Sequence, residues 1–520
     1  MNRGFSIGVI GGAAAAVCIL DALEQATGPA AGRAGWPPGE VTIFEPSNQL
    51  WRGRPYQRDT DAVRVNIPPA GMSIRQGDTG HFRRWLEATG QPAGPQHPQH
   101  DPHCDATFVS RSVYGDYLEY AAATAIERLR ERGWQVELVR QRVIEAAPTA
   151  DLVALRSQDG QVYTVNYAVL CVGAGPPRDS YELAGQPGFV PEPYPLGRTL
   201  DAIADADSVG VVGSGLTGVD TVLSLAARGY QGEIRLLSRS GVLPAVRQQV
   251  VPLTLRHFTA EHFRALAARG ERTTLAAVAA TMATEVTEAG GSWPDLVVEV
   301  DSVDREDPVA RLDRQLASIT AADPGLRILQ RAVPDTGPDV WPLLSVVEQR
   351  QVLSARYRTV MSLCCPMPPT SALRLRGLLS SGQLVITPDV HQVRPAGGGG
   401  FTVSTGAAEH RVAAVVNAVN PSPHYPHPAS QSLIDSLVQA GVTVRHPLGG
   451  VEVVRSTSGL TVAGTTSHRI YALGALAAGS LFFTFGMPSV VDRADDIVRA
   501  VVANAESVSA IGLPAGSATP

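Results

Sequence analysis

The sequence contains no lysine, so all 43 basic residues among its 520 are arginines. Catalysis through a lysine Schiff base is therefore excluded. Basic runs are absent too, and the net charge is −6, which leaves no electrostatic footprint for nucleic acid. The motifs of serine hydrolases (GxSxG), zinc proteases (HExxH) and P-loop proteins do not occur. A hydrophobic share of 44% and a charged share of 18% are typical of a globular protein.

Cysteine is scarce, with five residues and no CxxC pair. This favours a reduced, cytoplasmic setting over a disulfide framework. The adjacent Cys364 and Cys365 are interpreted as core packing. Three histidines and Cys104 lie in segment 90–107, which is rich in Pro, His and Gln. We expect this segment to be a flexible excursion, and no metal site is expected there.

Apolar runs long enough to span a bilayer are also missing, so no membrane partner is expected. One short run, Phe5–Ile10, follows Arg3 and leads into alanines. Two interpretations are open, a signal peptide or a buried strand that runs into a helix. The buried strand is favoured, because the glycines that follow stand where a strand-to-helix turn needs them.

The length predicts two to four domains, and two segments share a strand–glycine turn–helix–strand plan. The first comprises the strand Phe5–Ile10, the helix Ala13–Gln25 and the strand Val41–Glu45. The second comprises the strand Ser208–Val212, a helix to about Ala227 and the strand Glu233–Ser238. Because apolar segments flank the second unit on both sides, we expect an α/β fold of two Rossmann-type domains, the second inserted into the first.

The second glycine turn, Gly213-Ser214-Gly215-Leu216-Thr217-Gly218, fits the dinucleotide pattern GxGxxG. Its glycines permit the tight turn, the close approach of a pyrophosphate and the packing of helix on strand, respectively. The phosphates would lie at the helix N-terminus. Arg239 stands between Ser238 and Ser240 at the end of the second strand, where an arginine suits a 2′-phosphate. This favours NADPH over NADH.

The first glycine turn, Gly11-Gly12-Ala13-Ala14-Ala15-Ala16, is GxAxxA. Ala13 puts a methyl group where the backbone should approach a pyrophosphate, which loosens the case for tight binding. Glu45, at the end of the second strand, is the expected acceptor for a ribose hydroxyl. We therefore expect a dinucleotide site here, with a Rossmann core that has lost its ligand as the alternative.

Further segments resemble a bacterial group of two-domain FAD/NAD(P)-binding oxidoreductases, related to flavin monooxygenases and N-hydroxylases. The resemblance spans almost the whole chain. It is carried by the two glycine turns and by Gly53–Tyr56, Val65–Pro68 with Met72, Phe82–Leu86, Ser110–Tyr117, Ser238–Pro244, Trp341 with Leu343–Leu344, and Tyr471–Gly474.

The resemblance implies an FAD-binding domain at residues 1–200 and 390–510, an NAD(P)H-binding domain with helical elaboration at 201–389, and a flexible tail at 511–520. For FAD it implies contacts from Gly11, Gly12, Ala13, Ala14, Glu45, Arg54, Asn66, Met72, Val143, Val172, Gly173 and Gly474. For NADPH it implies contacts from Gly213, Ser214, Gly215, Thr217, Gly218, Ser238 and Arg239. Asn66 and Arg75 are the candidate polar groups beside the flavin.

The sequence departs from the group at three places, Ala13, the Cys364–Cys365 stretch and Asn420, which stands where a glycine beside the cofactor is usual.

The expected function is an FAD-dependent, NADPH-using oxidoreductase acting on a small molecule. A monooxygenase is preferred, with an amine as the substrate class. The alternatives are an NAD(P)H-flavin reductase or dehydrogenase without oxygenation, and a non-catalytic protein that retains the fold. The oligomeric state is not predicted.

Overall fold

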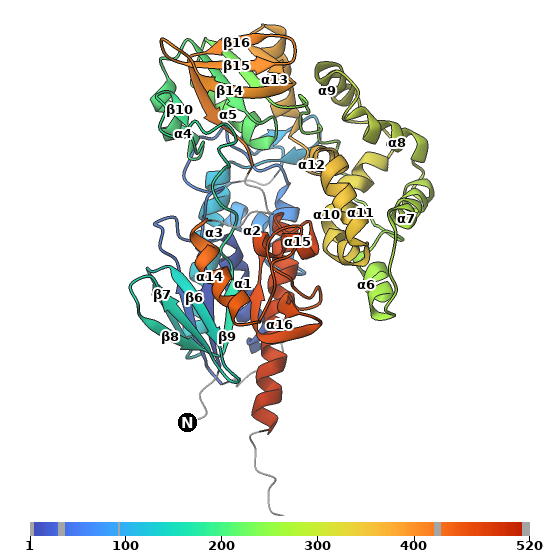
Figure 1. Ribbon diagram of the computed structural model, residues 1–520. Helices are drawn as coiled ribbons and strands as arrows, with labels where there is room; N and C mark the ends of the chain where they lie inside the picture. The colour runs from blue at the N-terminus through green and yellow to red at the C-terminus, as the bar shows by residue number, and fades with distance from the viewer. Residues whose placement is uncertain (1–4, 30–36, 92–93, 421–427, 512–520) are drawn as a thin grey trace, which may run out of the picture.

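The computed structural model describes residues 5–29, 37–91, 94–420 and 428–511 (Figure 1). The expected tail at 511–520 lies outside the described residues from 512 onward. Two parallel sheets form the two ends of the molecule in Figure 1, and a group of helices stands beside them. Within the described ranges, no helix has the length and apolar character needed to cross a bilayer.

The first sheet has five parallel strands and an antiparallel edge strand. Its buried strands are rich in Val, Ile and Tyr, as strands covered on both faces require. The expected strands are confirmed within one or two residues at most ends. In spatial order they are β18 (Gly459–Val462), β19 (Thr465–Ala472), β9 (Tyr167–Leu170), β1 (Ser6–Ile10), β2 (Glu40–Phe44) and β5 (Gln135–Val139).

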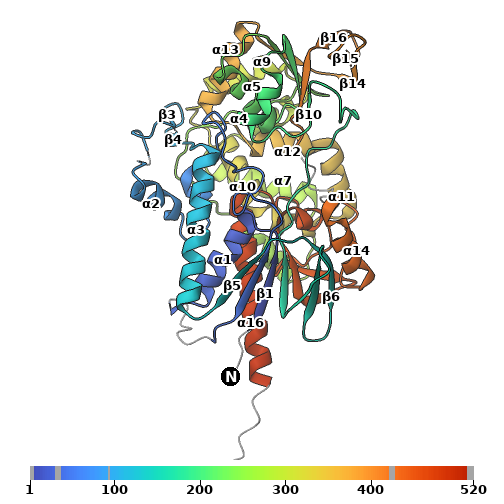
Figure 2. The same cartoon turned by 90° about the vertical axis from the view of Figure 1, so that its left-hand side faces the viewer.

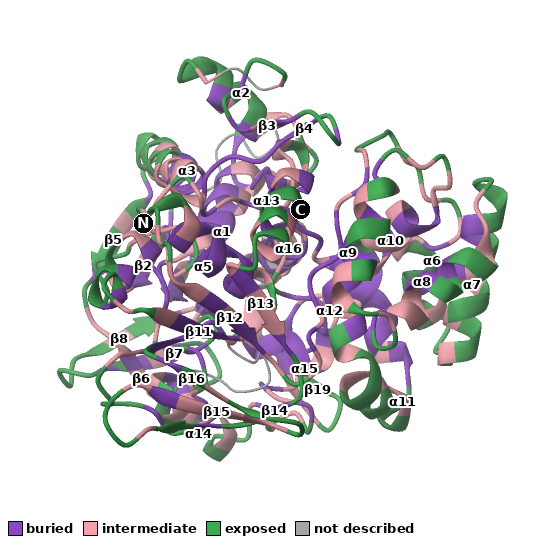
Figure 3. Cartoon of the chain, turned by 90° about the horizontal axis from the view of Figure 1, so that it is seen from above, coloured by how far each residue is buried: buried purple, intermediate pink, exposed green. Residues whose placement is uncertain are grey.

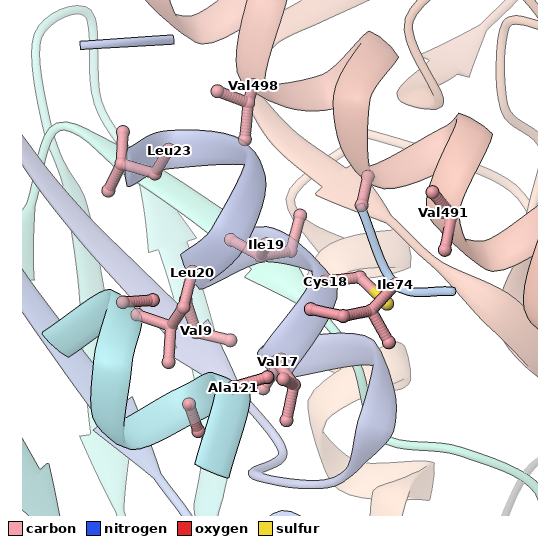
Figure 4. Packing of buried hydrophobic residues seen from close by; sticks show 14 of the residues in the cluster. Val9, Val17, Cys18, Ile19, Leu20, Leu23, Ile74, Ala121, Val491 and Val498 are labelled. Carbon is pink, nitrogen blue, oxygen red and sulfur yellow. The ribbon is translucent and has the colours of Figure 1, made fainter. Parts of the chain in front are cut away.

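Helices α1 (Ala14–Ala26), α3 (Arg111–Glu131) and α16 (Met487–Ile511) pack together on one face of this sheet. The other face is covered by an antiparallel sheet and α14 (Gln431–Gln439), as Figure 2 shows. That small sheet consists of β6 (Val143–Pro148), β7 (Val153–Ser157) and β8 (Val162–Val165). Figure 4 shows the core between α1 and its neighbours, formed by Val9, Val17, Ile19, Leu20, Leu23, Ala121, Val491 and Val498.

Burying each large side chain of this core contributes roughly 1.5–3 kcal/mol relative to exposure. The core therefore fixes the glycine turn between β1 and α1 on both sides. The last helix, α16, comes from the far end of the chain, so the first domain is closed by its C-terminal segment.

The second sheet is parallel throughout. Its order is β10 (Phe189–Val190), β17 (Ala414–Asn417), β11 (Ser208–Val212), β12 (Glu233–Leu237) and β13 (Leu384–Thr387). Its helices include α4 (Leu196–Thr199), α5 (Leu216–Ala227) and α13 (Pro369–Ser380). Beside it, β14 (Val390–Pro395), β15 (Phe401–Thr405) and β16 (Glu409–Val412) form an antiparallel sheet, with a glycine-rich turn between β14 and β15.

The expected boundary between the domains at 389/390 differs from these pairings. Strand β17 pairs with β11, and β10 pairs with β17, so residues 189–190 and 414–417 belong to the second sheet. The chain returns to the first sheet only at β18 and β19. The reason is that β17 supplies the apolar neighbour that β11 needs on its open side.

The helical elaboration lies to one side of both sheets (Figures 1 and 3). Its core is built on α10, whose apolar face packs against α6, α7, α8 and α12. The helices are α6 (Ala260–Ala268), α7 (Leu275–Glu288), α8 (Trp293–Ser302), α9 (Pro308–Ala317), α10 (Gly325–Val340), α11 (Val346–Gln351) and α12 (Tyr357–Cys364). The short α15 (Ala478–Leu481) also contacts α10.

The expectation that segment 90–107 is a flexible excursion is wrong for its described residues. After α2 (His81–Ala88), the segment forms a small hairpin of β3 (His100–Asp101) and β4 (Ala106–Thr107). The buried Asp101 carboxylate accepts hydrogen bonds from the backbone N–H and hydroxyl of Thr370 at 2.7 and 2.9 Å. The polar composition of this segment does not predict the contact, because Thr370 lies 269 residues away in the sequence.

Candidate active site

The first glycine turn lies at the carboxyl edge of the first sheet, between β1 and α1. Gly11 has φ +107°, and a Cβ atom there would stand 2.3 Å from the backbone oxygen of Cys171. Gly12 donates its N–H to the Glu45 carboxylate at 2.8 Å. The other carboxylate oxygen accepts from Ser47 N–H at 2.8 Å. Each oxygen keeps a lone pair, so Glu45 can still accept from a ribose hydroxyl.

The methyl group of Ala13 lies against Gly53. A Cβ atom at Gly53 would stand 2.7 Å from the Ala13 Cβ atom, and Gly53 has φ +58°. Gly53 thus makes room for a methyl group that the GxAxxA pattern alone places toward a pyrophosphate. Helix α1 has no side-chain cap and no acidic residue in its first turn. Its first amides, including that of Ala14, are therefore available to an anion.

Other residues expected at FAD follow neighbouring strands at the same sheet edge. Val172 and Gly173 come directly after β9, and Gly474 comes after β19. Gly173 and Gly474 have φ +69° and +80°, with open space where a Cβ atom would be. Val143 is buried at the start of β6. The positions after β9 and β19 fit a dinucleotide that runs across the strand ends of the first sheet.

The second glycine turn has the same backbone plan. Gly213 has φ +109°, and its Cβ atom would stand 2.7 Å from the backbone oxygen of Ala418. Gly218 lets α5 pack on the turn, because a Cβ atom there would stand 2.1 Å from the Gly213 oxygen. Helix α5 also lacks a side-chain cap and an acidic first turn. Both glycine turns therefore fit the phosphates of a dinucleotide.

Asn420 belongs to this second turn and not to the first, which corrects the expectation that it stands beside FAD. Thr217 donates its hydroxyl to the Asn420 side-chain oxygen at 2.8 Å. The Asn420 side-chain nitrogen would be the nearest atom to a Cβ atom at Gly215, at 3.7 Å. The reason is the pairing of β17 with β11, which brings the end of β17 to this turn.

Arg239 follows β12 and is exposed at the same edge of the second sheet. Ser238 accepts the Gly241 N–H on its hydroxyl at 2.8 Å, which shapes this turn. Ser214 donates its hydroxyl to the backbone oxygen of Val242 at 2.7 Å. The guanidinium of Arg239 makes no ion pair within the described chain and can bind a phosphate bidentately.

One cleft of about 1530 Å³ joins the second glycine turn to the loop after Val65. Its walls come from the first domain, the second domain and the helical elaboration. Ten of the residues predicted for the sites line it: Arg54, Asn66, Met72, Arg75, Gly213, Ser214, Gly215, Thr217, Ser238 and Arg239. The others lie outside its lining: Gly11, Gly12, Ala13, Ala14, Glu45, Val143, Val172, Gly173, Gly218 and Gly474.

The two candidate polar groups, Asn66 and Arg75, both face this cleft. Arg75 donates to the Asp21 carboxylate at 2.7 Å, so its guanidinium is already paired. Asn66 donates its side-chain N–H to the backbone oxygen of Pro366 at 3.3 Å. Asn66 therefore ties the first domain to the segment that follows the helical elaboration.

A buried ion pair spans the two domains beside the cleft. Arg111, at the start of α3, donates to Asp220 of α5 at 2.6 Å, and Tyr194 donates to the same carboxylate oxygen at 2.5 Å. Burial raises the pKa of the Asp220 carboxyl, and Arg111 acts in the opposite direction. Arg111 also donates to Tyr194 at 3.0 Å. This network fixes α5, and with it the second glycine turn, relative to the first domain.

Sequence reasoning missed several groups on the cleft, because their neighbours are distant in the chain. Asp492 on α16 lines it and forms no ion pair within the described residues. Asp335 on α10 lines it too and pairs with Arg331 at 3.4 Å. Cys364 belongs to a hydrophobic core cluster and Cys365 packs against it, which confirms the interpretation as core packing, and both also border the cleft. The described residues contain no group of His, Cys, Asp and Glu that could hold a metal ion.

Comparison with known proteins agrees with this geometry. Residues 8–175 match the family described as FAD-NAD(P)-binding. This part of the chain is thus similar to proteins that bind FAD and NAD(P), as the sequence predicts. An uncharacterized protein of Escherichia coli (strain K12), YdhS, is 23% identical over 239 residues, which span 40% of this chain and 42% of that protein.

Two solved structures share the fold along nearly the whole chain. The ornithine N-hydroxylase of Kutzneria sp. 744 is 14% identical with a TM-score of 0.58, over 96% of this chain and 99% of that one. The cadaverine monooxygenase of Erwinia amylovora, DfoA, is 12% identical with a TM-score of 0.56, over 97% and 95%. The expected fold class, with its parallel Rossmann-type sheets, is confirmed.

Proposed function

We propose that the protein is an FAD-dependent oxidoreductase that takes hydride from NADPH and oxygenates a small amine. The observation that carries the proposal is the single cleft shared by Gly213–Thr217 and Asn66–Met72. Hydride transfer needs the two cofactor rings to meet in one cavity with fixed orientation. The second glycine turn supplies a dinucleotide site on the wall of that cavity, and the first glycine turn supplies another in the first domain, outside the cavity lining.

When bound, NADPH supplies the hydride and FAD carries the redox chemistry. The chain binds and orients both groups. In this proposal Glu45 accepts from the FAD ribose, and the N-termini of α1 and α5 hold the pyrophosphates. Arg239 holds the 2′-phosphate, which distinguishes NADPH from NADH. The helical elaboration supplies one wall of the cleft.

An amine as the substrate class is supported by the carboxylates of the cleft. Asp492 is half-buried and forms no ion pair in the described chain. Burial raises the pKa of its carboxyl, while a hydrogen bond with Gln76 and the charges of Arg264 and Arg455 act in the opposite direction. A cationic ammonium group would replace the water that this carboxylate has lost. The two structural neighbours named above are described as acting on ornithine and cadaverine, both amines. This favours the same class here.

The proposal is tested by incubating the flavin-loaded protein with NADPH, oxygen and a panel of primary amines. We expect one amine to raise NADPH oxidation and to yield a product heavier by one oxygen atom. Asp492→Asn should raise the KM for that amine about tenfold, since a charged hydrogen bond contributes ~1.5–3 kcal/mol. Asp495→Asn on the same helix, which does not line the cleft, is the matched control.

The outcomes separate the proposal from its alternatives. NADPH oxidation without an oxygenated product from any amine would support a reductase. Absence of any bound flavin would support a non-catalytic protein. If Asp495→Asn raised the KM for the amine as much as Asp492→Asn does, the proposed role of Asp492 in amine binding would be contradicted.

A further inference from the structure

Arg247 lines the cleft without a carboxylate partner. No ion pair of Arg247 occurs within the described residues, and the side chain is half-buried. Three other arginines on the cleft each bind a carboxylate at 2.6–2.8 Å: Arg54 with Glu192, Arg75 with Asp21, and Arg111 with Asp220. Arg239, Arg327 and Arg358 also line the cleft without an ion pair among the described residues. Arg247 differs from them because its guanidinium is held by the Asn66 loop of the first domain.

The guanidinium of Arg247 is held in place by neutral groups. Its Nε and Nη2 atoms both donate to the backbone oxygen of Asn66, at 3.1 and 2.7 Å. Its own backbone N–H donates to Met367 at 2.9 Å, and Met367 donates to Ala245 at 2.8 Å. The third nitrogen, Nη1, has no acceptor among the residues that the structure describes. The side chain is therefore fixed at the cleft wall with one donor group unused.

This position is costly for a cation. Burial lowers the pKa of Arg247 to about 10, and the nearby groups that act in the opposite direction are the thiols of Cys104 and Cys365, which supply no ordinary counter-charge. A charge that has lost part of its water and has no counter-ion destabilises a folded protein unless a ligand completes the pair. Guanidinium binds carboxylates and phosphates with paired hydrogen bonds, so the missing ligand is an oxyanion.

We propose that Arg247 binds a carboxylate of the substrate and so selects substrates that carry an acidic group. This inference rests on the proposed function, in which the phosphates of the dinucleotide already have partners at the α5 N-terminus and at Arg239. The loop of Asn66 holds the guanidinium, and the segment at Met367 holds the backbone of Arg247, so the carboxylate docks where the two domains meet.

The test is calorimetric titration of the purified, flavin-loaded protein with benzoate and with glutarate, and separately with NADP⁺. We expect at least one of the two carboxylates to bind. Arg247→Gln should weaken that binding by about tenfold or more, and Arg247→Lys should weaken it less, because it retains the charge without the fork. NADP⁺ affinity should change by less than about twofold in Arg247→Gln.

Arg239→Gln is the matched control, and it should show the reverse pattern, with NADP⁺ weakened and the carboxylate retained. Circular dichroism verifies that each variant is folded. Three results would overturn the inference. Neither carboxylate binds the natural protein, the Arg247→Gln variant binds the carboxylate with unchanged affinity, or the Arg247→Gln variant loses affinity for NADP⁺ as much as Arg239→Gln does. Because the titration requires no turnover, failure of NADPH oxidation refutes the proposed function without deciding this result.

Discussion

The two glycine turns share a backbone plan but depend on glycine at different positions. Gly11 and Gly213 have almost the same φ, +107° and +109°, and each approaches a backbone oxygen of the neighbouring strand end. The third positions differ. Gly218 has no room for a methyl group, whereas the corresponding Ala16 carries one and is buried. The tight turn at the first glycine is therefore common to both sites, while the helix packs more closely on the turn in the second site.

The middle positions differ in another way. The methyl group of Ala13 meets Gly53, which is part of the loop after β2. A methyl group at Gly215 would meet no atom closer than 3.7 Å. The chain itself therefore tolerates alanine at either middle position. Any need for glycine at Gly215 must come from the ligand, whose pyrophosphate passes close to the backbone.

The largest effect is expected from Gly218→Ala. Its Cβ atom would stand 2.1 Å from the Gly213 oxygen, so α5 must move away from β11. We expect a loss of roughly 3 kcal/mol in the free energy of unfolding and loss of NADP⁺ binding. Urea unfolding and NADP⁺ titration measure both. Ala16→Gly, at the matched position of the first site, should cost only about 1 kcal/mol. Equal losses in the free energy of unfolding of the two variants would contradict the difference in helix packing between the two sites.

Arg239→Gln should change cofactor choice without affecting the fold. Removing a charged partner of the 2′-phosphate should raise the KM for NADPH about 30-fold, since such a hydrogen bond contributes ~1.5–3 kcal/mol. The KM for NADH, which lacks that phosphate, should change little. Steady-state rates with both cofactors provide the measurement. A parallel rise in the two KM values would contradict the assignment of Arg239.

Gly53→Ala should weaken the first site through Ala13. The new methyl group would stand 2.7 Å from that of Ala13, at a backbone with φ +58°. We expect a loss of about 2 kcal/mol in the free energy of unfolding, and Ala13→Gly should restore about half of it. The remaining loss reflects the left-handed backbone. If the double variant shows no rescue, the contact between the two residues is not the cause.

The smallest effect is expected from Glu45→Gln. The amide nitrogen cannot accept a hydrogen bond, so one of the two backbone donors, Gly12 or Ser47, loses its acceptor. We expect FAD affinity to fall about fivefold, measured by flavin retention on dialysis, because a net hydrogen bond contributes ~1 kcal/mol. Glu40→Gln, at the exposed start of the same strand, is the control. NADP⁺ affinity should not change.

Sequence reasoning predicted the two strand–turn–helix units well, because glycine placement and apolar runs are local signals. It placed β11 at its observed bounds and α1 within one residue. It failed where partners are distant. The anchoring of Asp101 by Thr370, the arrival of Asn420 at the second turn and the unpaired state of Arg247 all depend on how separate segments meet. No pattern within one segment records such contacts.

The central claim is that the two glycine turns hold different dinucleotides, which meet in one cleft. The direct measurement is an anaerobic visible spectrum of the FAD-loaded protein during titration with NADPH, and separately with NADH. We predict a yellow protein whose flavin absorbance is bleached by NADPH at a lower concentration than by NADH. A protein that binds no flavin, or a bound flavin that neither cofactor bleaches, would contradict the account.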